Sequence, residues 1–443
     1  MSTSPLSLSA RNCPLRTRAF GAAGSPGARV LAGPGEHAGA ESLASHIRRL
    51  GSMPDRNGPE VWMKLLRSCG LRGRGGSSFP VARKLDAAAA TGGNPLIVVN
   101  GSESEPASRK DATLLCLRPH LVIDGAVAVA KAVRSAQVIV VVHAGNSAAR
   151  MALQNAIAER QATMGAQEPS LSVSVNPDRY VAGEASAIVS LLEGGPALPR
   201  FDRTPTAVSG VHGRPTLVHN AETAAHLGLA ARFGVGWLAE AGSSLSPGTT
   251  LVTLVGTVPR PGQVLEVWGP ATIGDLLRSE GWSGGAPRAV LLGGYAGSWI
   301  DGDDAWDTTV GRSESGPSLG CGLIGVLADD ACGLRETARI MAYLAGESTG
   351  QCGPCAHGLP ALASTLAAMH AGRASRADVR RLHLQAASIA GRGACRHPDG
   401  AVALLDTAFQ VFADEIEAHR RWRCPAAGSH PVFPIPSGAS EWS

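Results

Sequence analysis

The sequence predicts an α/β domain with a Rossmann-like, largely parallel sheet, followed by a β-grasp-like module and a C-terminal helical bundle. Two β-branched runs, residues 95–100 and 137–143, are typical of buried strands and flank an apolar segment of helical length at 121–133. Residues 250–267 have the pattern of a β-hairpin closed by a Pro-Gly turn. Beyond residue 331 the apolar residues recur with helical periodicity, which predicts packed helices.

The individual elements follow in the same order. A helix over 148–161 and a strand over 171–175 continue the alternation that indicates a layered parallel sheet. After the hairpin we expect a short helix at 272–277 and a strand at 289–292. In the helical region Ser375 and Asp378 have the spacing of a helix N-cap and its third-position acid. Two apolar stripes predict core-facing helices: Val379, Leu382, Ala386 and Ile389, then Val402, Leu405, Phe409, Phe412 and Ile416.

Composition and charge argue against several classes of protein. The chain of 443 residues has a net charge of only +4 and no long basic run, which argues against a nucleic-acid partner. Its apolar runs are too short to span a bilayer, and no signal peptide precedes them, so we expect a cytoplasmic protein. The nine cysteines are therefore expected to be reduced, and a Cys-x-x-Cys pair indicates a metal or cluster site rather than a disulfide.

The changes in sequence pattern along the chain predict five segments. They are a mobile leader over 1–45, an α/β domain over 46–245, a β-grasp domain over 246–330, a helical domain over 331–424 and a disordered tail over 425–443.

A glycine-rich loop at residues 70–80 is the most informative segment. It carries two arginines and ends in Phe79, a composition suited to backbone N–H groups that approach a phosphorylated ligand while a flat ring closes over it. A flexible surface turn is the alternative. Only four of the basic residues are lysines. Lys84 follows this loop and Lys110 lies further along the chain, and a compact ammonium at such positions suits a phosphate oxygen.

The loop is followed by Asn100-Gly-Ser-Glu-Ser-Glu-Pro, by Lys110-Asp111, by Tyr180-Val-Ala-Gly-Glu and by Cys352-Gly-Pro-Cys355. In this order and spacing the chain resembles the NADH-binding flavoprotein subunit of respiratory complex I and its relatives in NAD-linked hydrogenases and formate dehydrogenases, as a divergent bacterial member. The resemblance covers about residues 50 to 420. It implies an FMN-binding α/β domain, an SLBB-type β-grasp module and a helical domain with an iron–sulfur cluster.

The resemblance also implies the residues around FMN. They are Gly73, Arg74, Gly75, Gly76, Phe79, Lys84, Asn100, Ser102, Glu103, Gly183, Glu184, His219, Asn220 and Thr223. Ser102 stands where the family has aspartate, and His219 where it has asparagine. No side chain is expected to act as an acid or base, and Glu103 and Glu184 are expected to position the cofactor. For Glu103 and Glu105, solvated loop carboxylates are the alternative.

The nicotinamide site departs further from the family pattern. Phe79 is retained, but Ala185 replaces an acid, Asp202 replaces a lysine and Pro205 replaces a phenylalanine. Three alternatives follow. NADH binds with the help of Phe79, Glu103 and Phe201; NADPH is tolerated because a repelling carboxylate is absent and Arg109 or Arg203 adds attraction; or the flavin exchanges electrons only with another protein.

For the iron–sulfur cluster, Cys352, Cys355 and Cys395 match three of the four family ligands, and Thr349 stands at the fourth. The resemblance therefore implies a 4Fe-4S or a 3Fe-4S cluster, with Cys321 or Cys332 as other sources of a fourth ligand. Packing cysteines without a cluster are the alternative.

The implied activity is NADH or NADPH oxidation by FMN, with electrons passed through the cluster to an acceptor. The expected acceptor is a ferredoxin-like or other iron–sulfur or haem protein, or a quinone-linked one if the chain is peripheral in a membrane complex. The alternative is an electron-transfer or scaffold subunit with a degenerate NADH site and a ferredoxin-type partner.

Overall fold

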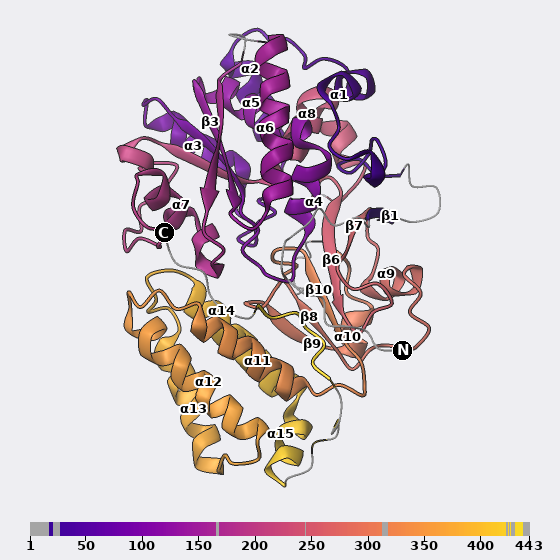
Figure 1. Cartoon of the computed structure of the whole chain (residues 1–443), viewed down its shortest axis with the longest axis vertical. Coiled ribbons are helices and arrows are strands. Elements are labelled where there is room, and N and C mark those ends of the chain that lie inside the picture. Colours follow the sequence, from indigo (N-terminus) through magenta and orange to yellow (C-terminus); the bar gives the residue numbers. More distant parts are fainter. Residues whose placement is uncertain are drawn as a thin grey trace.

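The computed structural model describes residues 17–20, 27–164, 168–243, 245–311, 318–421, 424, 426 and 430–436. Its first sheet has four parallel strands in the order β4-β3-β2-β5, with helices on both faces (Figure 1). The strands are β2 (Leu96–Gly101), β3 (Gln137–His143), β4 (Ser170–Asn176) and β5 (Thr216–Asn220). The helices are α1 (Leu43–Leu50), α2 (Pro59–Ser68), α3 (Val81–Ala90), α4 (Lys110–Leu117), α5 (Pro119–Val133), α6 (Ser147–Met164), α7 (Ala185–Leu192) and α8 (Ala221–Ala239), with the short η1 (Glu36–Ala38), η3 (Tyr180–Gly183) and η4 (Val211–Gly213).

The register of this sheet gathers polar side chains at one edge. Asn100 pairs with Asn220, and His143 pairs with Asn176, each at or next to the carboxyl end of its strand. In parallel α/β sheets ligands bind outside this edge, where the loops to the following helices begin. The predicted strands and the helices α5 and α6 are therefore confirmed, and together they present one polar edge.

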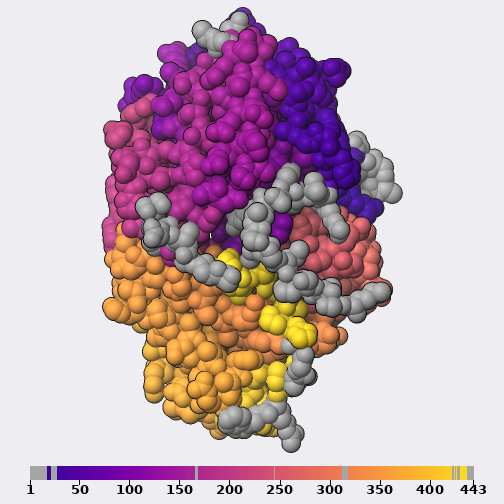
Figure 2. Space-filling view, in the orientation of Figure 1, coloured from indigo at the N-terminus to yellow at the C-terminus, as the bar shows by residue number. Residues whose placement is uncertain are grey.

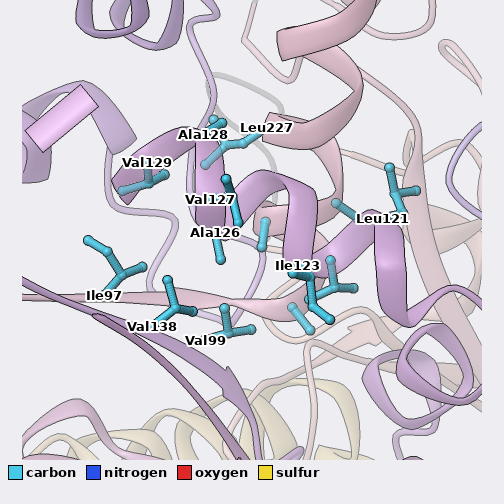
Figure 3. Close-up of a cluster of buried hydrophobic side chains, with 14 of the residues drawn as sticks. Ile97, Val99, Leu121, Ile123, Ala126, Val127, Ala128, Val129, Val138 and Leu227 are labelled. Atoms are coloured by element: carbon cyan, nitrogen blue, oxygen red, sulfur yellow. The ribbon is translucent and has the colours of Figure 1, made fainter. Parts of the chain in front are cut away.

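The core of the α/β domain lies between the sheet and the crossing of α5 with α8. Ile97, Val99 and Val138 face α5 from the strands, while Leu227 approaches from α8 (Figure 3). The two helices approach closely because α5 carries a glycine, Gly125, at the crossing. A Cβ on Gly125 would lie 1.7 Å from the carbonyl oxygen of Ala224 on α8. This contact fixes α8, whose N-terminus lies at the polar edge.

We therefore expect Gly125→Ala to lower the stability of the protein by about 3 kcal/mol, because the added methyl group forces the two helices apart. Gly236→Ala, also on α8, is the matched control. No atom lies within 4 Å of a Cβ at Gly236, and alanine is favoured over glycine in a helix by up to about 1 kcal/mol. Thermal unfolding followed by circular dichroism measures both variants. A Gly125→Ala protein as stable as the parent would contradict this packing.

The second sheet is mixed, with the strand order β1-β7-β6-β10-β8-β9. Its strands are β1 (Thr17–Phe20), β6 (Thr250–Gly256), β7 (Gln263–Val267), β8 (Ala289–Leu292), β9 (Ser298–Asp301) and β10 (Leu323–Leu327), and its helices are α9 (Ile273–Ser279) and α10 (Gly302–Trp306). β6 and β7 pair antiparallel, which confirms the predicted hairpin. β10 pairs parallel with β6 and antiparallel with β8.

The C-terminal part consists of helices that lie below the α/β domain (Figures 1 and 2). They are α11 (Gly333–Gly346), η5 (Pro354–Gly358), α12 (Leu359–His370), α13 (Arg376–Ile389), α14 (His397–Val411) and α15 (Ala413–Arg420). Ser375 and Asp378 form the predicted capping box of α13. In the two predicted stripes Leu382 and Leu405 are fully buried, whereas Val379 and Phe409 are half-buried and pack against the same core.

The described part of the segment expected as a mobile leader, residues 1–45, packs against the protein. β1 pairs in parallel with β7. The backbone N–H groups of Arg29, Val30 and Leu31 donate to the buried carboxylate of Glu266 over 2.8 to 3.0 Å. The structure thus differs from the expected leader here, because composition does not reveal that a distant buried carboxylate binds this backbone. Residues 1–16 and 21–26 lie outside the described residues.

A similar difference concerns the expected disordered tail, residues 425–443. Phe433 is only 2% exposed and packs in the core of the helical part. Arg335 and Arg339 of α11 donate to the carbonyl groups of His430 and Phe433. The tail is therefore attached to α11 over 430–436, and residues 437–443 lie outside the described residues.

The fold is thus a mixed α/β architecture built on a parallel sheet with covering helices. Among the described residues, no single helix is long and apolar enough to cross a membrane. The pair α4 and α5, bent by 96° at the break between them, passes that test only when the two are taken together.

Candidate functional site

The glycine-rich loop, residues 70–80, lies next to the polar edge of the parallel sheet. It folds back on itself, because the N–H of Gly73 donates to the carbonyl of Phe79 at 2.9 Å and Arg72 forms a β-bridge with Pro80. Phe79 is 42% exposed, so its ring is accessible for stacking by another flat group.

Arg74 anchors this loop to its surroundings. Its backbone N–H donates to Oγ1 of Thr223 in the first turn of α8, over 2.9 Å. Its guanidinium donates to the hydroxyls of Ser246 and Thr250 and to the carbonyl of Pro247. The guanidinium therefore joins the loop to the segment that enters β6, whereas the sequence suggested a direct contact with the cofactor.

A buried network of charges lies below the loop. Lys110 Nζ contacts Asp111 and Glu222, each at 2.9 Å, and Asn220 Nδ2 donates to Asp111 over 2.6 Å. Despite the penalty of burial, the ammonium of Lys110 holds the pKa of Glu222 at about 2. The Glu222 carboxylate also accepts the backbone N–H of Leu251 on β6, over 2.9 Å. Because Asn220 caps α8 with its side chain, this network fixes the helix N-terminus at the polar edge.

Glu103 has a structural position in this site. Its carboxylate accepts the backbone N–H groups of Asp111 and Ala112 and the hydroxyl of Ser108, over 2.8 to 2.9 Å. Burial, followed by the charge of Asp111, raises its pKa. Glu103 therefore accepts hydrogen bonds from backbone N–H groups in the first turn of α4 that have no acceptor within the helix. If Glu103 positions a cofactor, it does so through this turn.

The loop after β2 is joined to η3 by side-chain amides. Asn100 donates to the carbonyl of Gly183 over 2.8 Å, and Asn176 donates to the hydroxyl of Ser102 over 3.0 Å. A Cβ on Gly183 would lie 1.9 Å from Oγ of Ser104, so only glycine permits this approach. Four of the expected site residues are thereby gathered, since Glu184 follows Gly183 and caps α7 by accepting the N–H groups of Ser186 and Ala187.

Lys84 and His219 are neighbours at the other end of the edge. Lys84 Nζ donates to the carbonyl of Val218 over 2.8 Å, and burial lowers the pKa of Lys84 to about 8. His219 on β5 is buried, and burial together with the charge of Lys84 lowers its pKa to about 3. The imidazole is therefore neutral, and it can offer a hydrogen bond to a ligand but no positive charge.

We expect the ammonium of Lys84 to titrate near pH 8 in the folded protein, because its charged form is desolvated. An unfolded lysine titrates near pH 10.4, so the unfolded chain binds more protons between these values. This destabilising contribution is fully present below pH 8 and is relieved as the pH rises through the folded pKa. The ¹³Cε resonance of Lys84 in lysine-labelled protein, assigned by its loss in Lys84→Gln, reports the midpoint. A midpoint at or above about pH 10 would contradict the burial.

These residues fit a polar, anionic and partly flat ligand such as FMN. Among the described residues, the buried atoms His219 Nε2, Asn176 Oδ1 and Arg74 Nε have no hydrogen-bond partner. Gly76 has φ of 106°, and no atom lies within 4 Å of the place where its Cβ would be, so the loop has open space beside it. A helix N-terminus, a glycine loop with open space beside it and unpartnered polar side-chain atoms together suit a phosphate and ring oxygens.

The three expected cluster ligands lie in the helical part, where Cys395 is within electrostatic range of the other two and of Glu184. The turn at Cys352 is closed by the N–H of Cys355, which donates to the carbonyl of Cys352 over 3.1 Å. Burial raises the pKa of Cys395 to about 11, and the charges of Glu184 and of the Cys355 and Cys352 thiols add to the shift. Cys395 thus lies within electrostatic reach of both other thiols and of the residue that caps α7. Three thiols within range of one another suit three corners of an iron–sulfur cluster.

Cys321 and Cys332 have other neighbours. The thiol of Cys321 contacts the carbonyl of Gly293 at 3.2 Å, and burial, followed by the charge of Glu105, raises its pKa. Cys332 caps α11 and contacts His419 at 3.4 Å. Neither contact involves Cys352, Cys355 or Cys395, and Thr349, which stands at the fourth family position, is half-buried.

Two residues that the sequence left out of the site link its two halves. Glu105 accepts the N–H of Tyr295 over 2.7 Å and the hydroxyl of Tyr180 over 3.4 Å. The Tyr180 ring lies 5.5 Å from that of His397, and Arg179 pairs with Glu347 at 2.9 Å. Glu105 and Tyr180 stand inside the quoted motifs, which is the signal that could have identified them. The segment 179–184 therefore runs between the polar edge and the helical part.

The residues expected around the nicotinamide are more scattered. Phe201 is 61% exposed, and Asp202 follows it in the loop after α7, where it accepts the N–H of Thr204. Ala185 is the first residue of α7. Arg109 lies against Gly262 in the turn of the β6–β7 hairpin.

Comparison with known proteins agrees with this geometry. Residues 66–228 match the model of the Nuo51 FMN-binding domain, and residues 335–419 match the NADH-ubiquinone oxidoreductase-F iron-sulfur binding region. The chain is 31% identical over 388 residues to the F subunit of NADH-quinone oxidoreductase from Mycobacterium tuberculosis, covering 82% of this chain and 85% of that protein. The F subunit from Streptomyces coelicolor is also 31% identical (83% and 85% covered), and that from Escherichia coli K12 is 27% identical (81% and 84%).

Among solved structures, an NAD+-reducing [NiFe]-hydrogenase in the H2-reduced state matches with a TM-score of 0.75 and 25% identity. The match covers 82% of this chain and 63% of the hydrogenase chain, so this protein spans less than two thirds of that chain's length. The FMN-binding model covers the glycine-rich loop and the polar edge. The iron-sulfur model covers the three cysteines at 352, 355 and 395. The chain belongs to the family of NADH-quinone oxidoreductase F subunits.

Proposed function

We propose that this protein oxidises NADH with FMN and passes the electrons through an iron–sulfur cluster to a further redox protein. The observation that carries the proposal is the position of Glu184. This residue follows the glycine that contacts Asn100, caps α7, and lies within electrostatic reach of Cys395. The candidate flavin site and the candidate cluster site are thus neighbours within one chain, as electron transfer between them requires.

FMN would supply a hydride acceptor and the conversion of a two-electron donor into one-electron steps. The backbone N–H groups of the glycine loop and the N-terminus of α8 at Asn220 and Thr223 would bind its phosphate and polar oxygens. His219 would offer its unpartnered Nε2 as a neutral hydrogen-bonding group. The exposed ring of Phe79 would stack on a flat ring and exclude water from one face.

In the helical part, Cys352, Cys355 and Cys395 would hold a cluster, with Thr349 at its fourth corner. We further propose that the second sheet is an SLBB-type β-grasp domain and that the C-terminal helices are the bundle of the iron–sulfur domain. As relatives are named as subunits of an NADH-quinone oxidoreductase, we propose that this chain also works in a complex, with a ferredoxin-like or haem protein as acceptor.

The test is an anaerobic titration of FMN-loaded protein with NADH and with NADPH, followed by the absorbance of the flavin. Bleaching by about one equivalent of NADH supports the proposal. Bleaching by NADPH but not by NADH would show that NADPH is the substrate instead. If neither nucleotide bleaches the flavin while dithionite does, the protein is instead an electron-transfer subunit without a nicotinamide site.

Nucleotide preference is expected to depend on position 185. Ala185 begins α7 and lacks the carboxylate that would repel a 2′-phosphate, so we expect the preference for NADH over NADPH to be modest. Ala185→Glu should raise that preference about tenfold, equivalent to roughly 1.4 kcal/mol. Ala185→Gln, of nearly the same size without charge, is the control. Equal ratios of kcat/KM for the two nucleotides in all three proteins would rule out a role for this position.

A further inference from the structure

A second group of metal-binding side chains lies in the helical part, away from the three cluster cysteines. Cys332 at the N-cap of α11, His370 at the end of α12 and His419 on α15 each offer a ligand atom, and these atoms lie within 4.8 Å of one another. The Cys332 Sγ is 3.4 Å from Nε2 of His419, and the two histidine rings are 5.1 Å apart. Cys332 and His419 are buried, and His370 is half-buried.

Cys424 lies beside this group, next to Cys332. It follows α15 by four residues, is half-buried, and its thiol contacts that of Cys332 through a hydrogen bond. Two thiolates and two imidazoles are a common ligand set of structural zinc. Bond lengths of about 2.3 Å to sulfur and about 2.0 to 2.1 Å to nitrogen put the sulfur and nitrogen of a tetrahedral site roughly 3.6 Å apart. The observed separation of 3.4 Å between Cys332 and His419 is close to this value.

Hydrogen bonds around the group orient these atoms for metal binding. His419 Nδ1 lies 2.8 Å from the carbonyl oxygen of His370. A carbonyl can only accept, so Nδ1 carries the proton and the lone pair of Nε2 points towards Cys332. A second hydrogen bond of this kind is usual for a metal-ligating histidine. The Sγ of Cys332 in turn accepts the backbone N–H of Arg335 over 3.3 Å, a contact that favours a thiolate.

Glu415 is close to the group, yet its carboxylate has other partners. One oxygen lies 3.5 Å from Cys332 Sγ, while the carboxylate accepts the N–H of Leu334 at 3.0 Å and pairs with Arg288 at 2.6 Å. A neutral thiol has one proton and could satisfy only one of its two acceptors, Glu415 and His419. Zinc with two thiolates and two neutral imidazoles carries no net charge, which suits a site with little solvent.

We propose that Cys332, His370, His419 and Cys424 bind a structural Zn²⁺ ion. Four protein ligands leave no open position for a substrate, as in closed structural sites. The ion would join the ends of α12 and α15 to the N-terminus of α11. It would also fix the chain after α15 at the point where Arg335 binds the carbonyl of His430.

The first test uses the full-length protein without a histidine tag, purified from zinc-sufficient medium and dialysed against EDTA. Metal analysis should give about one zinc per chain. X-ray absorption at the zinc edge, which separates zinc from the iron of a cluster, should give about two sulfur atoms near 2.3 Å and two nitrogen atoms near 2.0 Å. Less than about 0.1 zinc per chain, or a zinc shell without sulfur, would overturn the proposal.

The second test uses single substitutions. His370→Gln and Cys424→Ser, both at half-buried positions, should each lower the zinc retained after EDTA at least about tenfold. His383→Gln on the exposed face of α13 is the matched control and should keep the ion. The double variant Cys352→Ala with Cys355→Ala should also keep it. Full zinc content in both ligand variants would overturn the proposal, and so would loss of zinc in the double variant, because the ion would then belong to the cluster cysteines.

Discussion

Replacement of Gly75 by valine is expected to weaken FMN binding by more than about a hundredfold, or roughly 3 kcal/mol. A Cβ at Gly75 would already lie 3.2 Å from Cβ of Asn220, and the branched side chain of valine would push the loop away from the residue that caps α8. The loop amides and the helix N-terminus would then no longer face the same ligand.

FMN titration followed by flavin fluorescence, together with desalting and absorbance, measures this loss. Ser77→Ala is the matched control, because Ser77 is exposed in the same loop and is not among the expected cofactor contacts. Circular dichroism should show that both variants remain folded. FMN affinity in Gly75→Val equal to that of the parent would contradict the position of the flavin site. Failure of the parent itself to retain FMN after refolding with excess cofactor would contradict the site altogether.

The second large effect concerns Thr349. Three thiols can bind three irons of a cubane, and a threonine hydroxyl is a poor fourth ligand because it is far less acidic than a thiol. Anaerobically reconstituted protein should therefore lose one iron readily on mild oxidation and give a 3Fe-4S species. Thr349→Cys should suppress this conversion. Iron and sulfide analysis with electron paramagnetic resonance measures both proteins.

Cys355→Ala and Cys69→Ala provide the controls for this experiment. Cys355→Ala should abolish the cluster and leave FMN binding intact. Cys69 is buried in the core of the α/β domain, where its thiol donates a hydrogen bond to the carbonyl of Leu65, and it should be replaceable without loss of iron. A four-iron cluster equally stable to oxidation in the parent and in Thr349→Cys would show that another group completes the site. Protein that never binds iron would make these three cysteines packing residues.

Much of the fold could be predicted because the relevant signals are local. The strands β2 and β3 are β-branched runs, and α13 begins with a capping box at Ser375. The attachment of the N-terminal segment could not be predicted, because it depends on Glu266, which lies far away in sequence and binds backbone rather than side chains. The same holds for Phe433, a single apolar residue in a proline-rich tail that fills a place in the helical core.

The motifs single out the residues of the candidate site, but they do not predict what each side chain contacts. The motifs identified Arg74 and Glu103, but their spacing gives no direction for a side chain. In the structure the Arg74 guanidinium points to Ser246 and Thr250, and Glu103 caps α4. The group of Cys332 with His370 and His419 was missed because its members come from three helices and share no short motif.

The central claim is that electrons from NADH reach the cluster through a flavin bound at the neighbouring site. The most direct test adds NADH anaerobically to FMN-loaded, cluster-containing protein and records flavin absorbance and the low-temperature paramagnetic signal of the cluster on the same sample. We expect the flavin to bleach and the signal of the reduced cluster to appear, while Cys355→Ala shows bleaching alone. A flavin that stays oxidised, or a cluster that stays oxidised beside a bleached flavin, would contradict the account.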